Sequence, residues 1–284
     1  MQWINKGNIL ITGLGLMGGS YAMALSRLGC HVAAIDTRRE AIDFALEKGI
    51  IKEGSTEVEP ALVSSADTVI FGLYPRTLPE WIKRWQHLFR PGAMITDVTG
   101  IKSSVVYEAQ ACLRKDVEFI AAHPMAGKEV SGVENSDDGI FRNANYIVTP
   151  TKANTRKAVE WCKDLGRILG CRKISVLSPE EHDEMIAFVS QLTHCIAVSL
   201  MTASENRHLA DYTGNSFRDL TRIARINEDM WSELFIMNKK PLLDKMDRFL
   251  GEFREFRDAL EAEDSEKMKE KMRLSTERRA WFDK

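Results

Sequence analysis

The stretch Gly13-Leu14-Gly15-Leu16-Met17-Gly18 constrains the fold of this chain more than any other segment. It directly follows the β-branched run at 9–11 and opens a helical pattern that reaches about residue 28. A strand, a glycine-rich turn and a helix in this order are typical of a βαβ unit whose turn holds a phosphate group. We therefore expect a Rossmann-type parallel sheet in the N-terminal part of the chain.

The glycines of this turn have separate physical tasks. Gly13 permits the tight turn, Gly15 lets the backbone approach a pyrophosphate, and Gly18 allows the helix to pack closely on the strand. The helix that the motif opens, through Leu16 and Met17, offers free N–H groups and a partial positive charge to an anion. A simple tight turn without a ligand is the alternative interpretation.

Asp36 ends the second predicted strand, 18 residues after Gly18. A carboxylate at this place accepts hydrogen bonds from the adenosine ribose and repels a 2′-phosphate, which favours NAD over NADP. Arg38 and Arg39 oppose this preference, because a guanidinium group could hold that phosphate. We expect NAD, with NADP as the alternative, and the following cofactor-binding residues: Gly13, Gly15, Leu16, Met17, Gly18, Asp36 and Arg38.

Strand and helix patterns alternate through the first 178 residues, which predicts βαβ units and a mostly parallel sheet. The pattern changes at Ser178-Pro179-Glu180-Glu181, where a capping serine, a proline and a glutamate predict the start of a helix. No convincing strand pattern follows. We expect an α/β Rossmann-type dinucleotide-binding domain over 1–178 and an all-α substrate and dimerisation domain over 179–284.

The segment 185–203 is apolar on nearly all sides, which is typical of a helix buried on several faces. Such a helix could form the core of its own domain, or a second subunit could cover it. Of these two interpretations we favour a homodimer through the helical domain.

Composition narrows the class of protein. The net charge of −2 gives no reason to expect nucleic acid or an anionic membrane as a partner. The five cysteines are odd in number and form no C-x-x-C pair, which argues against a disulfide framework and suits a reducing cytosol. No signal-peptide pattern opens the chain, and apolar stretches such as 195–203 are short for a membrane span. We expect a soluble, cytoplasmic protein with a small-molecule substrate.

His123 stands between a predicted end of a buried strand at 120–122 and Pro124, which stops a helix from following directly. Taken alone, it is best interpreted as a core histidine that the backbone satisfies. Its surroundings change that interpretation.

Four segments together resemble the prephenate/arogenate dehydrogenase family of tyrosine biosynthesis: 13–18, 123–132, 190–194, and 217–224 with 230–231 beyond it. The resemblance covers nearly the whole chain and implies a dinucleotide-binding domain joined to a helical dimerisation domain. It also implies an NAD-dependent oxidative decarboxylation that turns prephenate into 4-hydroxyphenylpyruvate, or arogenate into tyrosine.

The resemblance assigns a role to each matching residue. His123 would be catalytic, bonding the hydroxyl at ring carbon C4 and taking its proton. His194 would bind the substrate, and Arg222 would bind a carboxylate, which a planar guanidinium group matches with two hydrogen bonds. Asp219 could orient Arg222 from three residues earlier. Trp231 matches an aromatic residue near the substrate, and a buried core tryptophan is an equal alternative.

The chain departs from the family pattern after the fifth predicted strand. Family members commonly have Asp-x-x-Ser-x-Lys there, with the serine steadying the catalytic histidine. This chain has Asp97 and Lys102 at the ends of the motif but Gly100 at the serine position. Either Thr99 or Ser103 takes over the serine's task, or the residues that surround the histidine differ from those of the family, and the sequence does not decide between them. We expect Thr99 and Lys102 to support the site.

His182-Asp183 resembles a fragment of a metal-binding motif. No further ligands stand at useful spacing, so we predict no metal site.

The sequence bears on the choice between prephenate and arogenate as substrate. Arogenate carries an ammonium group where prephenate has a keto group, and no acidic residue lies among 190–193 beside His194. An unpaired buried ammonium group is costly, so the sequence favours prephenate, with Glu129 as the nearest possible partner for arogenate. A different β-hydroxyacid-type dehydrogenase and a non-catalytic dinucleotide sensor are the remote alternatives.

Overall fold

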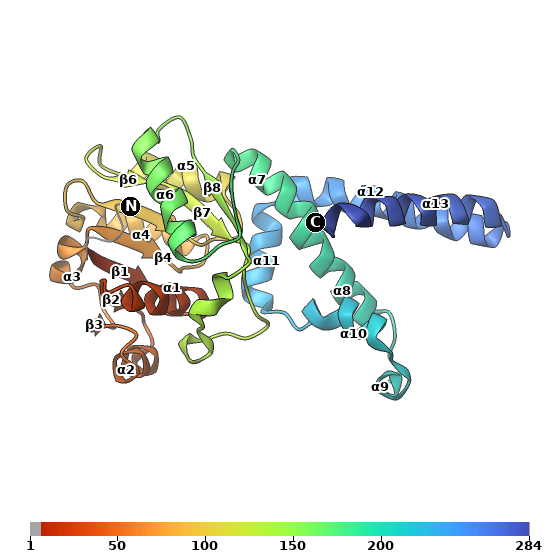
Figure 1. Ribbon diagram of the computed structural model, residues 1–284, viewed down its shortest axis with the longest axis horizontal. Coiled ribbons are helices and arrows are strands. Elements are labelled where there is room, and N and C mark those ends of the chain that lie inside the picture. The colour runs from red at the N-terminus through yellow and green to blue at the C-terminus, as the bar shows by residue number, and fades with distance from the viewer. Residues whose placement is uncertain (1–6, 284) are drawn as a thin grey trace.

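The computed structural model describes residues 7–283, and the first part of the chain is an α/β unit (Figure 1). Its main sheet has six strands in the order β3-β2-β1-β4-β5-β6, and every neighbouring pair is parallel. The order reverses direction at β1, as in Rossmann folds. The strands are β1 Asn8–Thr12, β2 His31–Ile35, β3 Glu53–Ser55, β4 Thr68–Phe71, β5 Met94–Asp97 and β6 Glu118–Phe119.

Helices cover both faces of this sheet. Ile9 and Ile11 of β1 belong to one buried apolar cluster and Leu10 to the other, so successive side chains enter opposite cores. The flanking helices are α1 Leu16–Arg27, α2 Arg39–Glu47, α3 Pro60–Ser65, α4 Thr77–Trp85 with η2 Gln86–Leu88, α5 Ser103–Cys112 and α6 Arg156–Ile168.

A second, smaller sheet of three strands adjoins the first and contains the histidine singled out above. It consists of β7 Ala121–Pro124, β8 Asn145–Thr149 and β9 Lys173–Val176, with β7 antiparallel to β8 and β8 parallel to β9. The sequence interpretation of a strand ending at Ala122 is therefore wrong. The chain leaves the first sheet after Phe119 and His123 lies inside β7, opposite Ile147. Short turns η3 Val133–Asn135 and η4 Asp138–Phe141 follow β7.

The helical part begins with the predicted cap. Ser178 accepts a hydrogen bond from the N–H of Glu181, whose side chain bonds back to the Ser178 N–H, so the capping box is present. The helices are α7 Pro179–Ile186, the π-helical turn η5 Ala187–Leu192, α8 Thr193–Thr202, α9 Leu209–Tyr212, α10 Asn215–Thr221, η6 Arg222–Ala224, α11 Glu228–Met237, α12 Lys239–Glu261, α13 Ser265–Arg279 and η7 Ala280–Phe282. Figure 1 shows α12 and α13 as a hairpin projecting away from the α/β unit.

The continuous helix from Pro179 to Thr202 is less covered than its composition suggests. Within one chain, Met185, Phe188 and Val189 are 52%, 58% and 49% exposed, so this chain alone does not bury the apolar helix on several sides. Length and composition alone would also allow this helix to cross a membrane. Its first turns instead carry buried polar side chains that pack against the α/β unit, namely His182 and Asp183.

Candidate active site

The glycine turn has the backbone geometry that its sequence predicts. Gly13 has a φ of +94°, and a Cβ there would lie 2.8 Å from the Gly72 carbonyl oxygen. A Cβ on Gly18 would lie only 1.9 Å from the Gly13 carbonyl oxygen, so α1 can pack this closely only with glycine. A Cβ on Gly15 would meet nothing within 4 Å. The turn is thus tight on its protein side and open at Gly15, at the N-terminus of α1, which fits a dinucleotide pyrophosphate.

Asp36 ties the end of β2 to this turn. Its carboxylate accepts hydrogen bonds from the N–H of Leu14 at 2.6 Å and from the N–H of Arg38 at 2.9 Å. The Arg38 guanidinium group in turn donates to the Leu14 carbonyl at 3.2 Å. A carboxylate has about four acceptor positions, so Asp36 still has acceptors for ribose hydroxyls. Arg39 donates to Thr56 instead.

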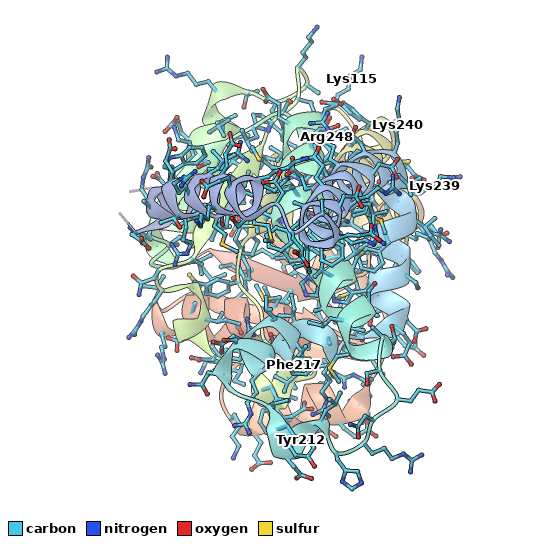
Figure 2. The ribbon with its side chains drawn as sticks, turned by 90° about the vertical axis from the view of Figure 1, so that its right-hand side faces the viewer. Lys115, Tyr212, Phe217, Lys239, Lys240 and Arg248 are labelled. Atoms are coloured by element: carbon cyan, nitrogen blue, oxygen red, sulfur yellow. The ribbon has the colours of Figure 1, made fainter. Side chains whose placement is uncertain are left out.

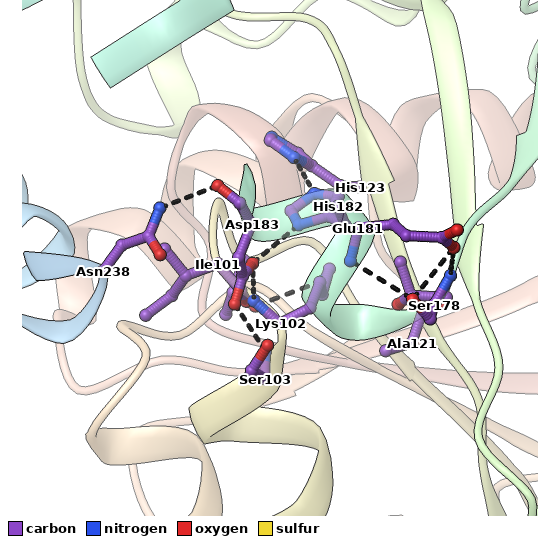
Figure 3. Close-up of polar contacts among 12 residues, drawn as sticks. Ile101, Lys102, Ser103, Ala121, His123, Ser178, Glu181, His182, Asp183 and Asn238 are labelled. Atoms are coloured by element: carbon purple, nitrogen blue, oxygen red, sulfur yellow. Dashed lines mark hydrogen bonds and ion pairs between the residues drawn. The ribbon is translucent and has the colours of Figure 1, made fainter. Parts of the chain in front are cut away.

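His123 contacts a second histidine from the helical part of the chain. Its Nδ1 lies 2.9 Å from Nε2 of His182, and Nδ1 of His182 lies 2.8 Å from Oδ1 of Asp183 (Figure 3). An ionised carboxylate only accepts hydrogen bonds, so Nδ1 of His182 carries the hydrogen and its Nε2 is an acceptor. His123 therefore donates from Nδ1, and its Nε2 has a free lone pair.

Asp183 also fastens α7 to the start of α5. Its two carboxylate oxygens accept hydrogen bonds from the backbone N–H groups of Lys102 and Ser103, each at 2.8 Å. A carboxylate at a helix N-terminus is favoured by the unpaired N–H groups and the helix dipole. From the other side, the Asn238 amide donates to the Asp183 carbonyl at 2.9 Å and to the Gln191 amide oxygen at 2.7 Å.

Lys102 is fully buried beneath His123. Its ammonium group lies 2.7 Å from a carboxylate oxygen of Asp97 and 2.6 Å from the carbonyl of Ala122, the residue before His123. Thr99 donates its hydroxyl hydrogen to Asp97 and accepts from Lys102 at 3.2 Å. A buried ion pair satisfied in this way holds the end of β5 against β7.

Of the alternatives that the sequence left open, the structure agrees with different residues around the histidine. The Thr99 hydroxyl is committed to the Asp97–Lys102 pair, and Ser103 contributes its backbone N–H to Asp183. Among the described residues, the side-chain partner of the His123 ring is His182. Sequence reasoning missed this pairing because the two histidines are 59 positions apart and on different elements.

Burial governs the protonation of these groups. It lowers the pKa of His123 well below the ordinary value of 6.5, and electrostatic interactions with His182 and with the Lys102 ammonium group act in the same direction. Burial also lowers the pKa of His182, against the opposing hydrogen bond to Asp183. Burial opposes ionisation of Asp183, but the hydrogen bonds that it accepts outweigh burial and lower its pKa. At neutral pH both rings are uncharged and the carboxylate is ionised.

His194 and Trp231 form a stacked pair at the far end of the π-helical turn. Their ring centroids are 3.7 Å apart and the ring planes are inclined by 30°. The Nδ1 of His194 donates to the Ser190 carbonyl at 2.9 Å, so its Nε2 is a free acceptor. π-Helical turns often occur at functional sites, and this one lies between the helix positions of Asp183 and His194. Trp231 is half-buried on α11.

Arg222 forms an ion pair with Glu129, which belongs to the loop that follows β7. Burial lowers the pKa of His194, while the Glu129 carboxylate acts to raise this pKa and the Arg222 guanidinium group acts to lower it. The carboxylate partner of Arg222 in the described chain is therefore Glu129, whereas the sequence had suggested Asp219. The pair is largely exposed on its Arg222 side, where the side chain is 64% accessible, so a ligand could reach it.

No group of three or more metal-binding side chains occurs among residues 7–283. The polar side chains at this site form hydrogen bonds to one another and to backbone groups.

Comparison with known proteins agrees with this arrangement. Residues 21–175 match the family model described as "Prephenate dehydrogenase, nucleotide-binding domain", and residues 178–274 match "Prephenate dehydrogenase, dimerization domain". The prephenate dehydrogenase of Bacillus subtilis is 33% identical over 270 residues, covering 93% of this chain and 72% of that protein. The cyclohexadienyl dehydrogenase of Zymomonas mobilis is 26% identical, covering 96% of this chain and 94% of that protein.

A solved structure is similar over almost the whole length. The prephenate dehydrogenase of Aquifex aeolicus, solved with hydroxyphenyl propionate and NAD+, superposes with a TM-score of 0.88 at 32% identity, covering 97% of this chain and 98% of that chain. The arogenate dehydrogenase of Synechocystis shares the fold, with a TM-score of 0.81 at 20% identity and coverage of 97% and 99%. With both family models matched and the fold shared from end to end, the chain belongs to the prephenate dehydrogenase family.

Proposed function

We propose that this chain is an NAD-dependent dehydrogenase that oxidatively decarboxylates prephenate to 4-hydroxyphenylpyruvate. The observation that carries the proposal is the hydrogen-bond chain from Asp183 through His182 to Nδ1 of His123. With Asp183 ionised, this chain leaves the lone pair of His123 Nε2 for a substrate proton. The similar Aquifex aeolicus enzyme was solved with NAD+, and the glycine turn and Asp36 of this chain fit that cofactor.

In this proposal NAD, when bound, accepts the hydride that leaves ring carbon C4 of the substrate. His123 takes the C4 hydroxyl proton on Nε2 as the general base. The bond between C1 and its carboxylate breaks, carbon dioxide leaves, and the bonding electron pair completes the aromatic ring. The proton then returns from His123 to the oxygen, which becomes the phenol hydroxyl of the product. His123 thus lends the proton and ends the cycle neutral.

The substrate's carboxylates require cationic or hydrogen-bonding partners in the pocket. We propose that Arg222 binds one of them with a bidentate contact, exchanging Glu129 for the substrate. The Nε2 of His194 and the face of Trp231 would line the ring side of the pocket, and Thr99, Lys102 and Asp97 would support His123 from below. We assign the orienting role in the free protein to Glu129, because it is the carboxylate that pairs with Arg222 in the described part of the chain.

Arogenate is the second candidate substrate, and Glu129 is the observation that favours it. Its carboxylate lies beside Arg222 and His194, where it could pair with the ammonium group of arogenate once Arg222 turns to the substrate. We retain prephenate as the preferred substrate, because no acidic residue lies among 190–193 beside His194 to pair with an ammonium group. Relatives named prephenate dehydrogenase and cyclohexadienyl dehydrogenase are both similar to this chain.

The deciding experiment is to measure kcat/KM for prephenate and for arogenate with NAD, following the absorbance of the reduced cofactor. The proposal predicts a higher value for prephenate. An arogenate value tenfold or more above it would reverse the choice. In that case Glu129→Gln should lower the arogenate value while leaving prephenate turnover in place, which would identify the missing carboxylate.

We further propose that the division lies at 178/179 and that the chain acts as a cytoplasmic homodimer through its helical domain. The matching family model is described as a dimerization domain, and the exposed apolar face of the helix Pro179–Thr202 lies within it.

A further inference from the structure

One position beside the His123 ring carries no side chain. Gly100 lies close to the His123 ring: a Cβ built on Gly100 would lie 4.0 Å from Cε1 of His123 and 3.5 Å from the Leu234 side chain. These are ordinary van der Waals distances, and Gly100 does not have a positive φ. A Cβ atom could therefore stand at this position in ordinary contact with its neighbours, yet the chain has none.

His182 supplies a hydrogen-bond partner for the His123 ring, which Gly100 cannot do without a side chain. It is fully buried, and it reaches the His123 ring from α7, not from the loop between β5 and α5. Its own orientation is fixed by Asp183, whose carboxylate is anchored to two backbone N–H groups of a different helix. The hydrogen bonds between the helical part and the α/β unit therefore determine which way the His123 ring faces.

The order of hydrogens in this chain has a chemical consequence. If Nε2 of His182 did not accept, His123 could carry its hydrogen on either nitrogen, and only the form with a free Nε2 could act as the base. When His123 takes a proton, the same acceptor bonds the resulting imidazolium.

We infer that His182, oriented by Asp183, is the positioning residue of His123. It forms the hydrogen bond to the His123 ring that a polar side chain at position 100 would otherwise form. This inference rests on the proposed function, because it concerns the base of that reaction. His182 does not touch the reacting atoms. It selects the competent tautomer of His123 and holds the ring against rotation.

The test compares two substitutions of similar size. His182→Gln keeps both functions, because the amide can accept from His123 and donate to Asp183, whereas His182→Met keeps only the volume. We expect kcat to fall roughly 10²-fold in His182→Met and less than about tenfold in His182→Gln, with KM and NAD affinity nearly unchanged in both. Thermal unfolding and NAD titration establish that each variant is folded.

The space at position 100 supplies a rescue experiment. In the His182→Met background, Gly100→Ser should recover about tenfold or more of the lost kcat, because its hydroxyl can bond the His123 ring. Gly100→Ala adds the same Cβ without a hydroxyl and should recover nothing.

Each result bears on one of two claims. If the wild-type chain oxidises neither prephenate nor arogenate, the proposed function fails, whatever His182 does. If the wild type is active and folded His182→Met keeps more than half its kcat, or serine and alanine at position 100 behave alike, the inference about His182 is overturned. Should His182→Met not fold, a folded His182→Gln variant with a kcat loss of more than a hundredfold would equally overturn it.

Discussion

His123 has Nδ1 bonded to His182, which leaves the lone pair of Nε2 for a proton, and its pKa is lowered first by burial and then by interactions with His182 and Lys102. A base must be neutral to accept a proton. Because the pKa lies well below 6.5, His123 is already neutral throughout the physiological range. We therefore expect kcat to be flat from about pH 6.5 upward and to fall only at more acidic pH. A kcat profile with a limb centred at or above pH 6.5 would contradict this assignment.

Replacing the base should affect chemistry and spare binding. His123→Asn should reduce kcat by about 10²- to 10⁴-fold, the usual contribution of a general base, and leave the dissociation constant of NAD unchanged. Stopped-flow turnover and fluorescence titration measure the two quantities. A variant that retains over half of the wild-type kcat would remove His123 from the mechanism.

Arg222 belongs to recognition in this scheme. Loss of a charge-assisted hydrogen bond, worth about 1.5–3 kcal/mol, corresponds to a KM for the substrate that is roughly ten- to a hundredfold higher in Arg222→Gln. Arg225→Gln is the matched control, since Arg225 is exposed three residues further on. Equal KM values in the two variants would show that Arg222 does not bind the substrate.

At the scale of single elements, two glycines of the turn have different roles: Gly18 is needed for packing of the protein, and Gly15 for binding of the cofactor. Gly18→Ala places a methyl group 1.9 Å from a backbone oxygen and should destabilise the protein by about 1–3 kcal/mol or more. Gly15→Ala meets nothing within 4 Å in the protein, so it should keep the melting temperature and weaken NAD binding, because the methyl group enters the space of the pyrophosphate. Calorimetry and NAD titration of both variants check this, and a Gly15→Ala variant with unchanged NAD affinity would refute the placement of the pyrophosphate.

Elements whose pattern is local were predictable from sequence, and those set by partners were not. The strands β1, β2, β4 and β5 are β-branched runs, and the capping box before α7 uses four consecutive residues. β3 has the sequence Glu-Gly-Ser and no apolar pattern, so it exists only because β2 lies beside it. The break between β6 and β7 lies within one apolar run, and only the tertiary structure assigns its two halves to different sheets.

The site shows the same division. Gly13 and Gly18 have the tight geometry that the motif requires, and Asp36 bonds the same turn, because these features belong to one turn and its neighbouring strand. The partners of His123 and Arg222 come from distant segments, and neither was predicted: His182 instead of Thr99 or Ser103, and Glu129 instead of Asp219. The π-helical turn, too, left no signal in the sequence.

At the scale of the whole molecule, the exposed apolar surface predicts association. Met185 and Phe188, with Glu184, Lys245 and Arg248, line a hollow on the helical part. Figure 2 shows Arg248 on this face, with Tyr212 and Phe217 on the arm formed by α9 and α10, and Tyr212 is 78% exposed. Two copies that bury such surfaces gain about 25 cal/mol for each Å² of apolar area removed from water.

Analytical ultracentrifugation should therefore find a dimer. Phe188→Asp, which puts a charge at a side chain that is 58% exposed in the single chain, should weaken the dimer by at least tenfold. Lys115→Glu changes charge on an exposed position of the α/β unit and should leave the dimer intact. A wild-type protein that sediments as a monomer at micromolar concentration would refute the homodimer.

The helix from Pro179 to Thr202 carries His182 and Asp183 at one end, His194 further along, and exposed Phe188 and Val189 between them. If a second copy covers that middle stretch, assembly and ligand binding act on one rigid body, and thermodynamic linkage makes them reciprocal. If dimerisation raises the affinity for substrate by some factor, bound substrate raises the association constant of the dimer by the same factor. Dilution would then lower affinity for the substrate, and a small molecule that wedges between the subunits would act as an inhibitor without entering the pocket.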